Sequence, residues 1–225
     1  MRKLLSPLVL AALFAIGFPI VFVLITTLPR SVAWRCSQAL YRTFFRAVGI
    51  DIEVSGAAHL SRPDSFVLMG NHQSALDHFV LCVASPVPIV GLERARNLRL
   101  PIYGSLMRRW GNISVEAGDK AKNALHLAKA REALARERLA LLIFPEGTRG
   151  ATMGAFRMGG FRFVADAGFD VVPFRLDGAH QLMPRGQKTI SAGRIRVDFR
   201  TALAAHASPE ALADRVRTAL TTKTA

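Results

Sequence analysis

The amino-acid sequence predicts an α/β protein with a central, mostly parallel mixed sheet flanked by helices and preceded by N-terminal membrane-associated helices. Short apolar runs recur between residues 50 and 200, and stretches with helical periodicity separate them. No charged residue occurs from Leu4 to Leu28. We therefore expect two parts: residues 1–49 with a membrane helix and an amphipathic basic helix, and residues 50–225 as one α/β domain.

The uncharged N-terminal stretch is long enough to cross a bilayer as a helix, which needs about 20 residues. A cleaved signal peptide also begins with basic residues, but its apolar part is shorter and ends at a small-residue site that is not evident here. Pro7, Gly17 and Pro19 favour a kink, so a helix lying in the interface remains an alternative. Basic residues flank both ends, and the positive-inside rule therefore gives no orientation.

Residues 31–49 combine aromatic and basic side chains at helical spacing, as a helix lying on a membrane surface does. The alternative is an ordinary surface helix packed on the domain. The chain has 30 Lys and Arg against 16 Asp and Glu, a net charge of +14, which points to an anionic partner. We expect an anionic membrane surface and no nucleic acid, because a nucleic-acid-binding protein would not need the uncharged N-terminus.

Six segments between residues 50 and 200 have strand character. Continuous apolar runs suit strands buried on both faces, and alternation suits half-buried ones. Strands are expected at 50–56, 66–70, 87–91, 139–144, 171–176 and 189–200. Pro173 favours an edge position or a strand end for its segment. Helices are expected near 75–84, 100–110, 119–138, 156–167 and 209–220.

The stretch NHQSALD, residues 71–77, places His72 five positions before Asp77. On one continuous helix these side chains would lie about 140° apart and could not meet. They can meet if the helix begins near Ser74, and Ser74-x-x-Asp77 has the form of a capping box. A carboxylate on one imidazole nitrogen would make the other a better base. The alternative is that Asp77 only caps the helix and His72 is an ordinary turn residue.

A metal site built from His72, Asp77 and His78 is a further alternative. No second cluster of ligand residues in the sequence completes such a shell, so we expect no metal. Cys36 and Cys82 are far apart in apolar surroundings, which indicates free thiols.

The stretch IFPEGTRG, residues 143–150, follows a predicted buried strand. Loops at the carboxyl ends of strands in α/β sheets are common ligand sites. Gly147 relaxes the backbone, Thr148 offers a hydroxyl, and Arg149 offers a planar fork that suits phosphate. Taken alone, Glu146 and Arg149 could equally form a surface ion pair at a turn.

Together the two stretches resemble the glycerolipid acyltransferase family typified by 1-acylglycerol-3-phosphate acyltransferase. NHQSALD fits its N-H-x-S-x-x-D motif, FPEGTR fits its third motif, and residues 156–159 and 171–176 resemble two further motifs. The resemblance covers roughly residues 50–200. It is weaker at residues 92–118, where Arg94 replaces a usual Lys and Glu116 begins the stretch that replaces a usual Arg. Arg94, Arg108 or Arg109 could substitute for that arginine.

The resemblance implies transfer of a fatty acyl group from acyl-CoA or acyl-carrier protein to the free hydroxyl of a lyso-lipid. The first expected acceptor is 1-acylglycerol-3-phosphate, with another lysophospholipid or lyso-ornithine lipid as alternatives. The alternative from another class is a basic membrane- or nucleic-acid-binding protein without catalysis. His72 would act as general base and Asp77 would orient it. The acceptor head group would be held by Glu146, Gly147, Thr148, Arg149 and Arg94.

No cofactor beyond the acyl-thioester co-substrate is expected. The same resemblance, with the N-terminal stretch, places the protein at a bacterial cytoplasmic membrane with its active site on the cytoplasmic face.

Overall fold

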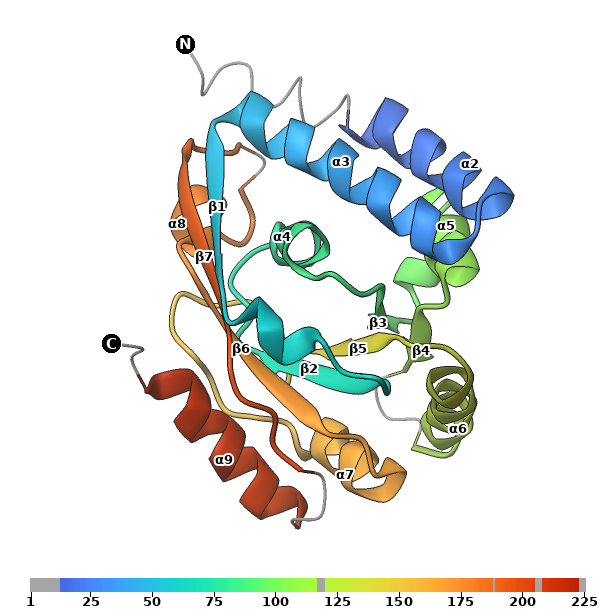
Figure 1. Cartoon of the computed structure of the whole chain (residues 1–225), viewed down its shortest axis with the longest axis vertical. Helices are drawn as coiled ribbons and strands as arrows, with labels where there is room; N and C mark the ends of the chain where they lie inside the picture. Colours follow the sequence, from blue (N-terminus) through green and yellow to red (C-terminus); the bar gives the residue numbers. More distant parts are fainter. Residues whose placement is uncertain (1–12, 117–119, 188, 205–207, 223–225) are drawn as a thin grey trace.

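The computed structural model describes residues 13–116, 120–187, 189–204 and 208–222. Its centre is a seven-stranded sheet in the order β1-β7-β6-β2-β5-β3-β4 (Figure 1). Every neighbouring pair is parallel except β6 and β7. The strands are β1 (Ile50–Ser55), β2 (Phe66–Gly70), β3 (Ile89–Arg94), β4 (Ile113–Val115), β5 (Ala140–Ile143), β6 (Val171–Asp177) and β7 (Gly193–Phe199). The predicted mostly parallel mixed sheet is confirmed, and the short β4 was not predicted.

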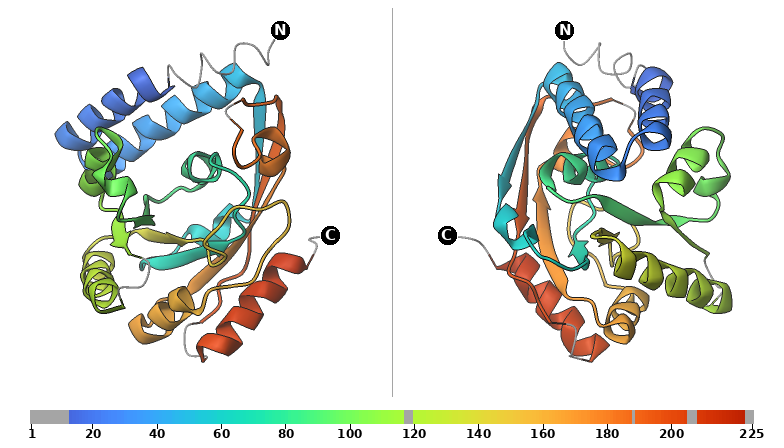
Figure 2. Two further views of the ribbon diagram at one scale, coloured as in Figure 1. Left: turned by 180° about the vertical axis from the view of Figure 1, so that it is seen from behind. Right: turned by 45° about the vertical axis from the view of Figure 1, so that its right-hand side comes forward.

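Helices cover both faces of the sheet, as Figures 1 and 2 show. The helices are α2 (Phe18–Thr27), α3 (Arg30–Val48), α4 (Asp77–Ala84), α5 (Tyr103–Trp110), α6 (Lys120–Arg136), α7 (Met158–Ala167), α8 (Ala179–Leu182) and α9 (Pro209–Thr221). One core cluster joins α3 and α4 to the sheet, and a second joins α6, α7 and α9 to its other face. Short helical turns occur at Leu13–Gly17, Ala57–Leu60 and Asn97–Arg99.

The burial of the strands follows the sequence pattern. All five residues of β2 and all four of β5 are buried, as expected for continuous apolar runs between two helix layers. In β7, Ile195, Val197 and Phe199 are at most 1% exposed, while the residues between them face outward. The alternation of apolar and polar residues in β7 therefore correctly predicted that Ile195, Val197 and Phe199 face the core.

The edge position predicted from Pro173 is wrong, because β6 lies between β2 and β7. On one side Pro173 is paired with Met69 of β2. On the other side it lies just past the end of β7, where the N–H of Arg200 donates to its carbonyl at 2.8 Å. Proline has no backbone N–H to donate in return. Because Pro173 lies opposite the end of β7, this missing hydrogen bond costs little.

The predicted membrane helix falls partly outside the described residues, which begin at residue 13. From there the chain forms a π-helical turn, Leu13–Gly17, and then the ten-residue α2. In the described ranges no helix is both long and apolar enough to cross a membrane.

The aromatic face of α3 packs on the domain, so the surface-helix alternative is correct for this face. Trp34, Tyr41, Phe44 and Phe45 are buried in the same core cluster as α4. The Nε1–H of Trp34 also donates to the carbonyl of Ser85 at 3.2 Å. These aromatic rings are therefore not free to enter a membrane.

Candidate active site

The loops that follow β2 and β5 are brought together by the sheet. These strands are neighbours, and their register pairs Met69 with Ile143. His72 and Glu146 each follow their paired residue by three positions. The two sequence motifs therefore meet at the carboxyl edge of the sheet, which is the ligand-binding edge of α/β folds.

His72 and Asp77 are in contact, as the sequence geometry predicted. The Nδ1 atom of His72 lies 2.7 Å from Oδ2 of Asp77, whose side chain is fully buried. The same Oδ2 accepts the backbone N–H groups of Gln73 at 2.6 Å and Ser74 at 2.9 Å. The bond to Ser74 is one half of the expected capping box, although α4 itself begins at Asp77. The carboxylate holds Nδ1 as the protonated nitrogen and leaves the lone pair on Nε2.

The remaining polar residues of this loop fix its shape. The side-chain amide of Asn71 exchanges two hydrogen bonds with the backbone of Leu176 on β6, at 2.7 and 2.8 Å. The hydroxyl of Ser74 donates to the carbonyl of Met183 at 2.8 Å. The loop carrying His72 is therefore held by hydrogen bonds to β6 and to Met183, just after α8.

Aromatic packing fixes the orientation of the His72 imidazole against Phe144. Its ring stacks on Phe144 with a centroid separation of 3.9 Å and an angle of 13°. Phe144 also contacts the ring of His78 edge-on at 5.3 Å. Burial, and secondarily the neighbouring His72, lowers the pKa of His78 to about 4. His78 is therefore neutral near pH 7 and packs as an uncharged ring.

Glu146 joins the two loops. Its carboxylate accepts the backbone N–H of His72 at 2.9 Å and that of Gly154 at 2.6 Å. Glu146 is only 4% exposed, so its oxygens face backbone donors. The surface ion pair with Arg149 does not form. The contact expected between Glu146 and an acceptor head group stays a prediction. Gly150 donates its N–H to the carbonyl of His72 at 3.0 Å, a second hydrogen bond between the two loops.

Gly147 is required by its backbone conformation. Its φ of +65° lies in the left-handed region, and an added Cβ would approach the guanidinium of Arg157 to 2.8 Å. Both conditions disfavour larger side chains at this position. The tight turn directs Thr148 and Arg149 outward, and both are exposed.

Arg149 lies beside the imidazole of His72. Its Nε–H points at Nε2 of His72 from 3.3 Å. Because Nδ1 is bound to Asp77, this is the nitrogen that carries the lone pair. In this arrangement the guanidinium covers the nitrogen of His72 that does not contact Asp77.

Two further arginines flank the exposed turn. Arg94, at the end of β3, donates to the carbonyl of Gly147 at 3.1 Å. Arg185 donates to the hydroxyl of Thr148 at 3.1 Å. Within the described residues, neither these two nor Arg149 has a carboxylate within ion-pair distance, so positive charge gathers here uncompensated. Such a set suits an anionic group.

The sequence pattern placed Arg94 correctly beside the loop and did not reveal Arg185. Nothing in the local sequence marks Arg185, which reaches Thr148 only through the fold. Arg108, named as a possible substitute, instead donates to the carbonyl of Leu98 and to Ser105 on its own helix. It therefore does not join the cluster at Thr148.

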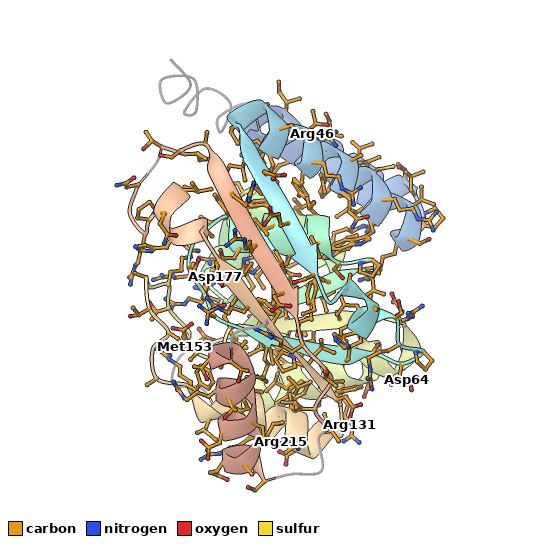
Figure 3. The ribbon with its side chains drawn as sticks, turned by 60° about the vertical axis from the view of Figure 1, so that its left-hand side comes forward. Arg46, Asp64, Arg131, Met153, Asp177 and Arg215 are labelled. Atoms are coloured by element: carbon orange, nitrogen blue, oxygen red, sulfur yellow. The ribbon has the colours of Figure 1, made fainter. Side chains whose placement is uncertain are left out.

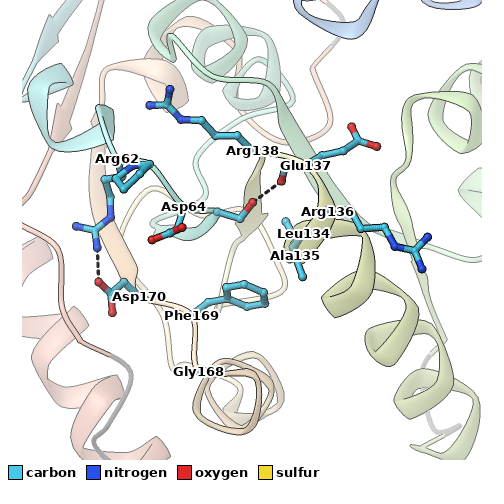
Figure 4. A pocket seen from close by; sticks show the side chains of 12 residues that line it. Arg62, Asp64, Leu134, Ala135, Arg136, Glu137, Arg138, Gly168, Phe169 and Asp170 are labelled. Carbon is cyan, nitrogen blue, oxygen red and sulfur yellow. Dashed lines mark hydrogen bonds and ion pairs between the residues drawn. The ribbon is translucent and has the colours of Figure 1, made fainter.

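A cavity of about 510 Å³ lies at the other edge of the sheet (Figure 4). It is lined by residues 62–65, 134–138 and 168–170, which directly precede β2, β5 and β6. Arg62 and Asp170 form an ion pair on its wall, and Ser65 donates to the carbonyl of Glu137. Because it lies at the amino ends of the strands, it is separate from the His72 site.

A buried carboxylate thus contacts a histidine, beside a turn whose neighbouring arginines have no carboxylate partner within the described residues. Residues 51–177, more than half of the chain, match the family model described as Acyltransferase. The chain belongs to this family.

Two relatives from different organisms illustrate the similarity. A 1-acyl-sn-glycerol-3-phosphate acyltransferase of Chlamydomonas reinhardtii is 30% identical over 191 residues, covering 83% of this chain and 55% of that protein. One of Saccharomyces cerevisiae is 28% identical, covering 75% of this chain and 58% of that protein. The chain thus spans about half the length of the curated relatives it matches.

A solved structure has the same fold. The 1-acyl-sn-glycerophosphate (LPA) acyltransferase PlsC from Thermotoga maritima superposes with a TM-score of 0.83 at 18% identity. The match covers 97% of this chain and 94% of that one.

Proposed function

We propose that this protein transfers a fatty acyl group from an acyl thioester, acyl-CoA or acyl-carrier protein, to the free hydroxyl of a lyso-lipid. The proposed acceptor is 1-acylglycerol-3-phosphate, and the product is then phosphatidic acid. The observation that carries the proposal is the His72–Asp77 contact of 2.7 Å, with the free nitrogen of His72 directed at Arg149. The family match and the names of the relatives support it.

The chemistry needs no protein nucleophile. Nε2 of His72 takes the proton of the acceptor hydroxyl while the hydroxyl oxygen bonds to the thioester carbonyl carbon. The tetrahedral intermediate then expels the thiolate as the C–S bond breaks, and His72 returns the proton to sulfur. General-base assistance of this kind contributes about 10²–10⁴-fold. Asp77 stabilises the imidazolium that forms between the two proton transfers.

Arg149 must leave His72 before the reaction, because both the guanidinium and the hydroxyl need Nε2. An acceptor phosphate offers the guanidinium two charged oxygens, a stronger partner than one neutral nitrogen. Binding of the acceptor therefore uncovers the base. In the absence of acceptor, Arg149 still covers Nε2 of His72. A water molecule therefore cannot easily be activated by His72 to hydrolyse the thioester.

A second acceptor class follows from the sequence, because Glu116 begins the stretch where the family usually has a phosphate-binding arginine. Arg94 and Arg185 can supply that charge from either side of the turn. If they do, a phosphate monoester is the better acceptor. If they do not, another lysophospholipid or lyso-ornithine lipid is.

The exposed apolar residues of α2 provide a proposed membrane contact. Ile20, Phe22 and Val23 are 36–57% exposed, and Ile102, just before α5, is 60% exposed. Helices α2 and α5 pack side by side in Figure 1. Arg35 and Arg46 are exposed on the adjoining α3, where Figure 3 labels Arg46. Apolar side chains next to arginines are typical of a surface that lies on anionic lipid.

The activity is tested with the purified full chain, labelled acyl-CoA or acyl-carrier protein, and a panel of lyso-lipids. We expect a labelled diacyl product, lost by orders of magnitude in folded His72→Ala and retained under strong chelation. Near-normal turnover in His72→Ala would refute the assigned base. Loss of activity on chelation would instead favour the metal-site alternative.

The membrane contact is tested by flotation with vesicles of anionic phospholipid. A Val23→Asp, Ile102→Asp variant should float less than the wild type. Val54→Asp is the matched control, because Val54 is also an exposed apolar residue, at 41%, but lies on β1. Equal flotation of all three proteins would refute the contact.

A further inference from the structure

The segment between Arg149 and α7 makes hydrogen bonds to the two loops that carry His72 and Glu146. Residues 150–157 form neither helix nor strand. Three backbone N–H groups of this segment nevertheless bond to the motif loops: Gly150 to the carbonyl of His72 at 3.0 Å, Gly154 to Glu146 at 2.6 Å, and Arg157 to the carbonyl of Pro145 at 2.8 Å. The position of this irregular segment therefore sets the position of the Glu146 carboxylate.

Arg217, on the C-terminal helix α9, holds the opposite side of the same segment. Its guanidinium carbon lies 4.2 Å from the centre of the Phe156 ring. Its Nη2 also donates to the carbonyl of Gly154 at 3.3 Å. Gly154 is thus bound through its N–H to Glu146 and through its carbonyl to Arg217. Phe156 in turn stacks on Phe161 of α7, at 5.7 Å and 27°.

These contacts form one chain from α9 to the base. Arg217 bonds Gly154, Gly154 bonds Glu146, and Glu146 bonds the backbone N–H of His72. A buried carboxylate that loses a hydrogen-bond donor must find another or shift, because an unsatisfied buried charge is costly. A shift of Glu146 would move the backbone of His72 directly. Misplacement by a fraction of an ångström is enough to slow a reaction that depends on alignment.

Docking of α9 does not depend on this arginine. The helix packs on the sheet through Leu212, Val216 and Leu220, which are at most 1% exposed. Arg217 lies half-buried at its edge. Removing the guanidinium should therefore leave the helix in place and loosen only the segment that it contacts.

We propose that Arg217 is a positioning residue for His72, acting through Gly154 and Glu146. This inference rests on the proposed acyl transfer. It assigns to α9, which lies beyond the family match at residues 51–177, a part in aligning the catalytic base. Arg217 itself touches neither substrate.

The test compares Arg217→Ala and Arg217→Lys with Arg215→Ala in the full-length protein. Arg215 is an exposed arginine of the same helix (Figure 3), so its removal changes the charge equally. Hydrogen exchange of residues 150–157 should be about tenfold faster in Arg217→Ala and unchanged in Arg215→Ala. Arg217→Lys, which keeps a cation over Phe156, should recover part of the protection.

Kinetics with acyl-CoA and 1-acylglycerol-3-phosphate distinguish positioning from general destabilisation. Arg217→Ala should lower kcat about tenfold and leave both KM values within about twofold, since the binding surface is untouched. A double-mutant cycle with Glu146→Gln adds the decisive readout. If Arg217 acts through Glu146, Arg217→Ala should change kcat less than about twofold in the Glu146→Gln background.

Each outcome decides the inference. Exchange or kcat of Arg217→Ala equal to that of Arg215→Ala would refute it, as would additive effects in the cycle. If the wild type transfers no acyl group to any lyso-lipid, the proposed function is wrong. In that case faster exchange specific to Arg217→Ala still supports the contact chain, and unchanged exchange overturns it.

Discussion

Replacing Asp77 by Asn isolates the charge that the structure places beside the base. Asp77 is fully buried, and one of its oxygens accepts three hydrogen bonds, from the His72 ring and from the N–H groups of Gln73 and Ser74. Asparagine keeps the size of the side chain and removes the charge. If its NH₂ group faces His72, it also donates to Nδ1 and moves the ring proton to Nε2, which then has no lone pair for the substrate.

The expected loss follows from the electrostatics of the pair. For a charge separation of about 4 Å and an effective dielectric of about 20, the attraction between carboxylate and imidazolium is about 4 kcal/mol. Since about 1.4 kcal/mol corresponds to a tenfold change in rate, kcat should fall about 10³-fold. Stability should fall as well, because three charge-assisted bonds become neutral ones at a cost of about 1 kcal/mol each.

The assay is steady-state acyl transfer to 1-acylglycerol-3-phosphate, with thermal melting to show that the variant is folded. Asp51→Asn is the control, because Asp51 is an exposed carboxylate on β1, 68% accessible and 3.7 Å from Arg194. It should retain wild-type kcat. A folded Asp77→Asn enzyme with kcat within tenfold of the wild type would show that the carboxylate does not stabilise a charged His72, and the general-base reasoning would fail.

Three further predictions test other parts of the site. Arg149→Ala should raise the acceptor KM tenfold or more by loss of a charged phosphate contact, and should raise thioester hydrolysis without acceptor because Nε2 of His72 is no longer covered; a change confined to the KM of the acyl donor would contradict the phosphate contact. The folded-state pKa of His78 is about 4, below its usual 6.5, so the unfolded chain binds the extra proton between these values, and stability should fall by up to about 3 kcal/mol as the pH drops through that window. Denaturant unfolding of His78→Gln should show a smaller pH dependence there, and an equal slope would be evidence against a buried neutral imidazole. Gly147→Ala should lose about 1–2 kcal/mol of stability from the positive φ alone, together with activity as Arg157 is displaced; unchanged melting temperature and turnover would show that the turn adapts freely.

Much of the fold follows from patterns that depend only on neighbouring residues. The buried runs at Phe66–Gly70 and Ala140–Ile143 and the alternation in Gly193–Phe199 predicted strands and their faces, because burial on one or both sides dictates which positions are apolar. The contact between His72 and Asp77 was also predictable, since helix geometry allows it only when the helix begins after His72. Local geometry allowed this contact, and the resemblance of the two motifs to the family favoured it over an ordinary turn.

Errors arose where a local preference was outweighed by the arrangement of elements distant in sequence. Pro173 favoured an edge position or a strand end. Strand β6 is not at the edge, but Pro173 lies opposite the end of β7, where the sheet tolerates the missing N–H. The aromatic and basic pattern of α3 indicated a membrane surface, but periodicity gives the apolar face of a helix and not the partner that covers it. Arg185 was missed for the same reason, because its partner Thr148 is identified only by the three-dimensional contacts.

The same contacts divide the site into a fixed part and a free part. Asn71 binds β6, Asp77 binds three donors, and Glu146 binds the backbone on either side, so the imidazole of His72 is held before any substrate arrives. Thr148 and Arg149 are instead exposed, and their side chains contact Arg185 and His72 respectively. This division suits the proposed reaction. A base works best when it is already aligned as the substrate binds, whereas a guanidinium that must leave Nε2 for a phosphate needs freedom to move.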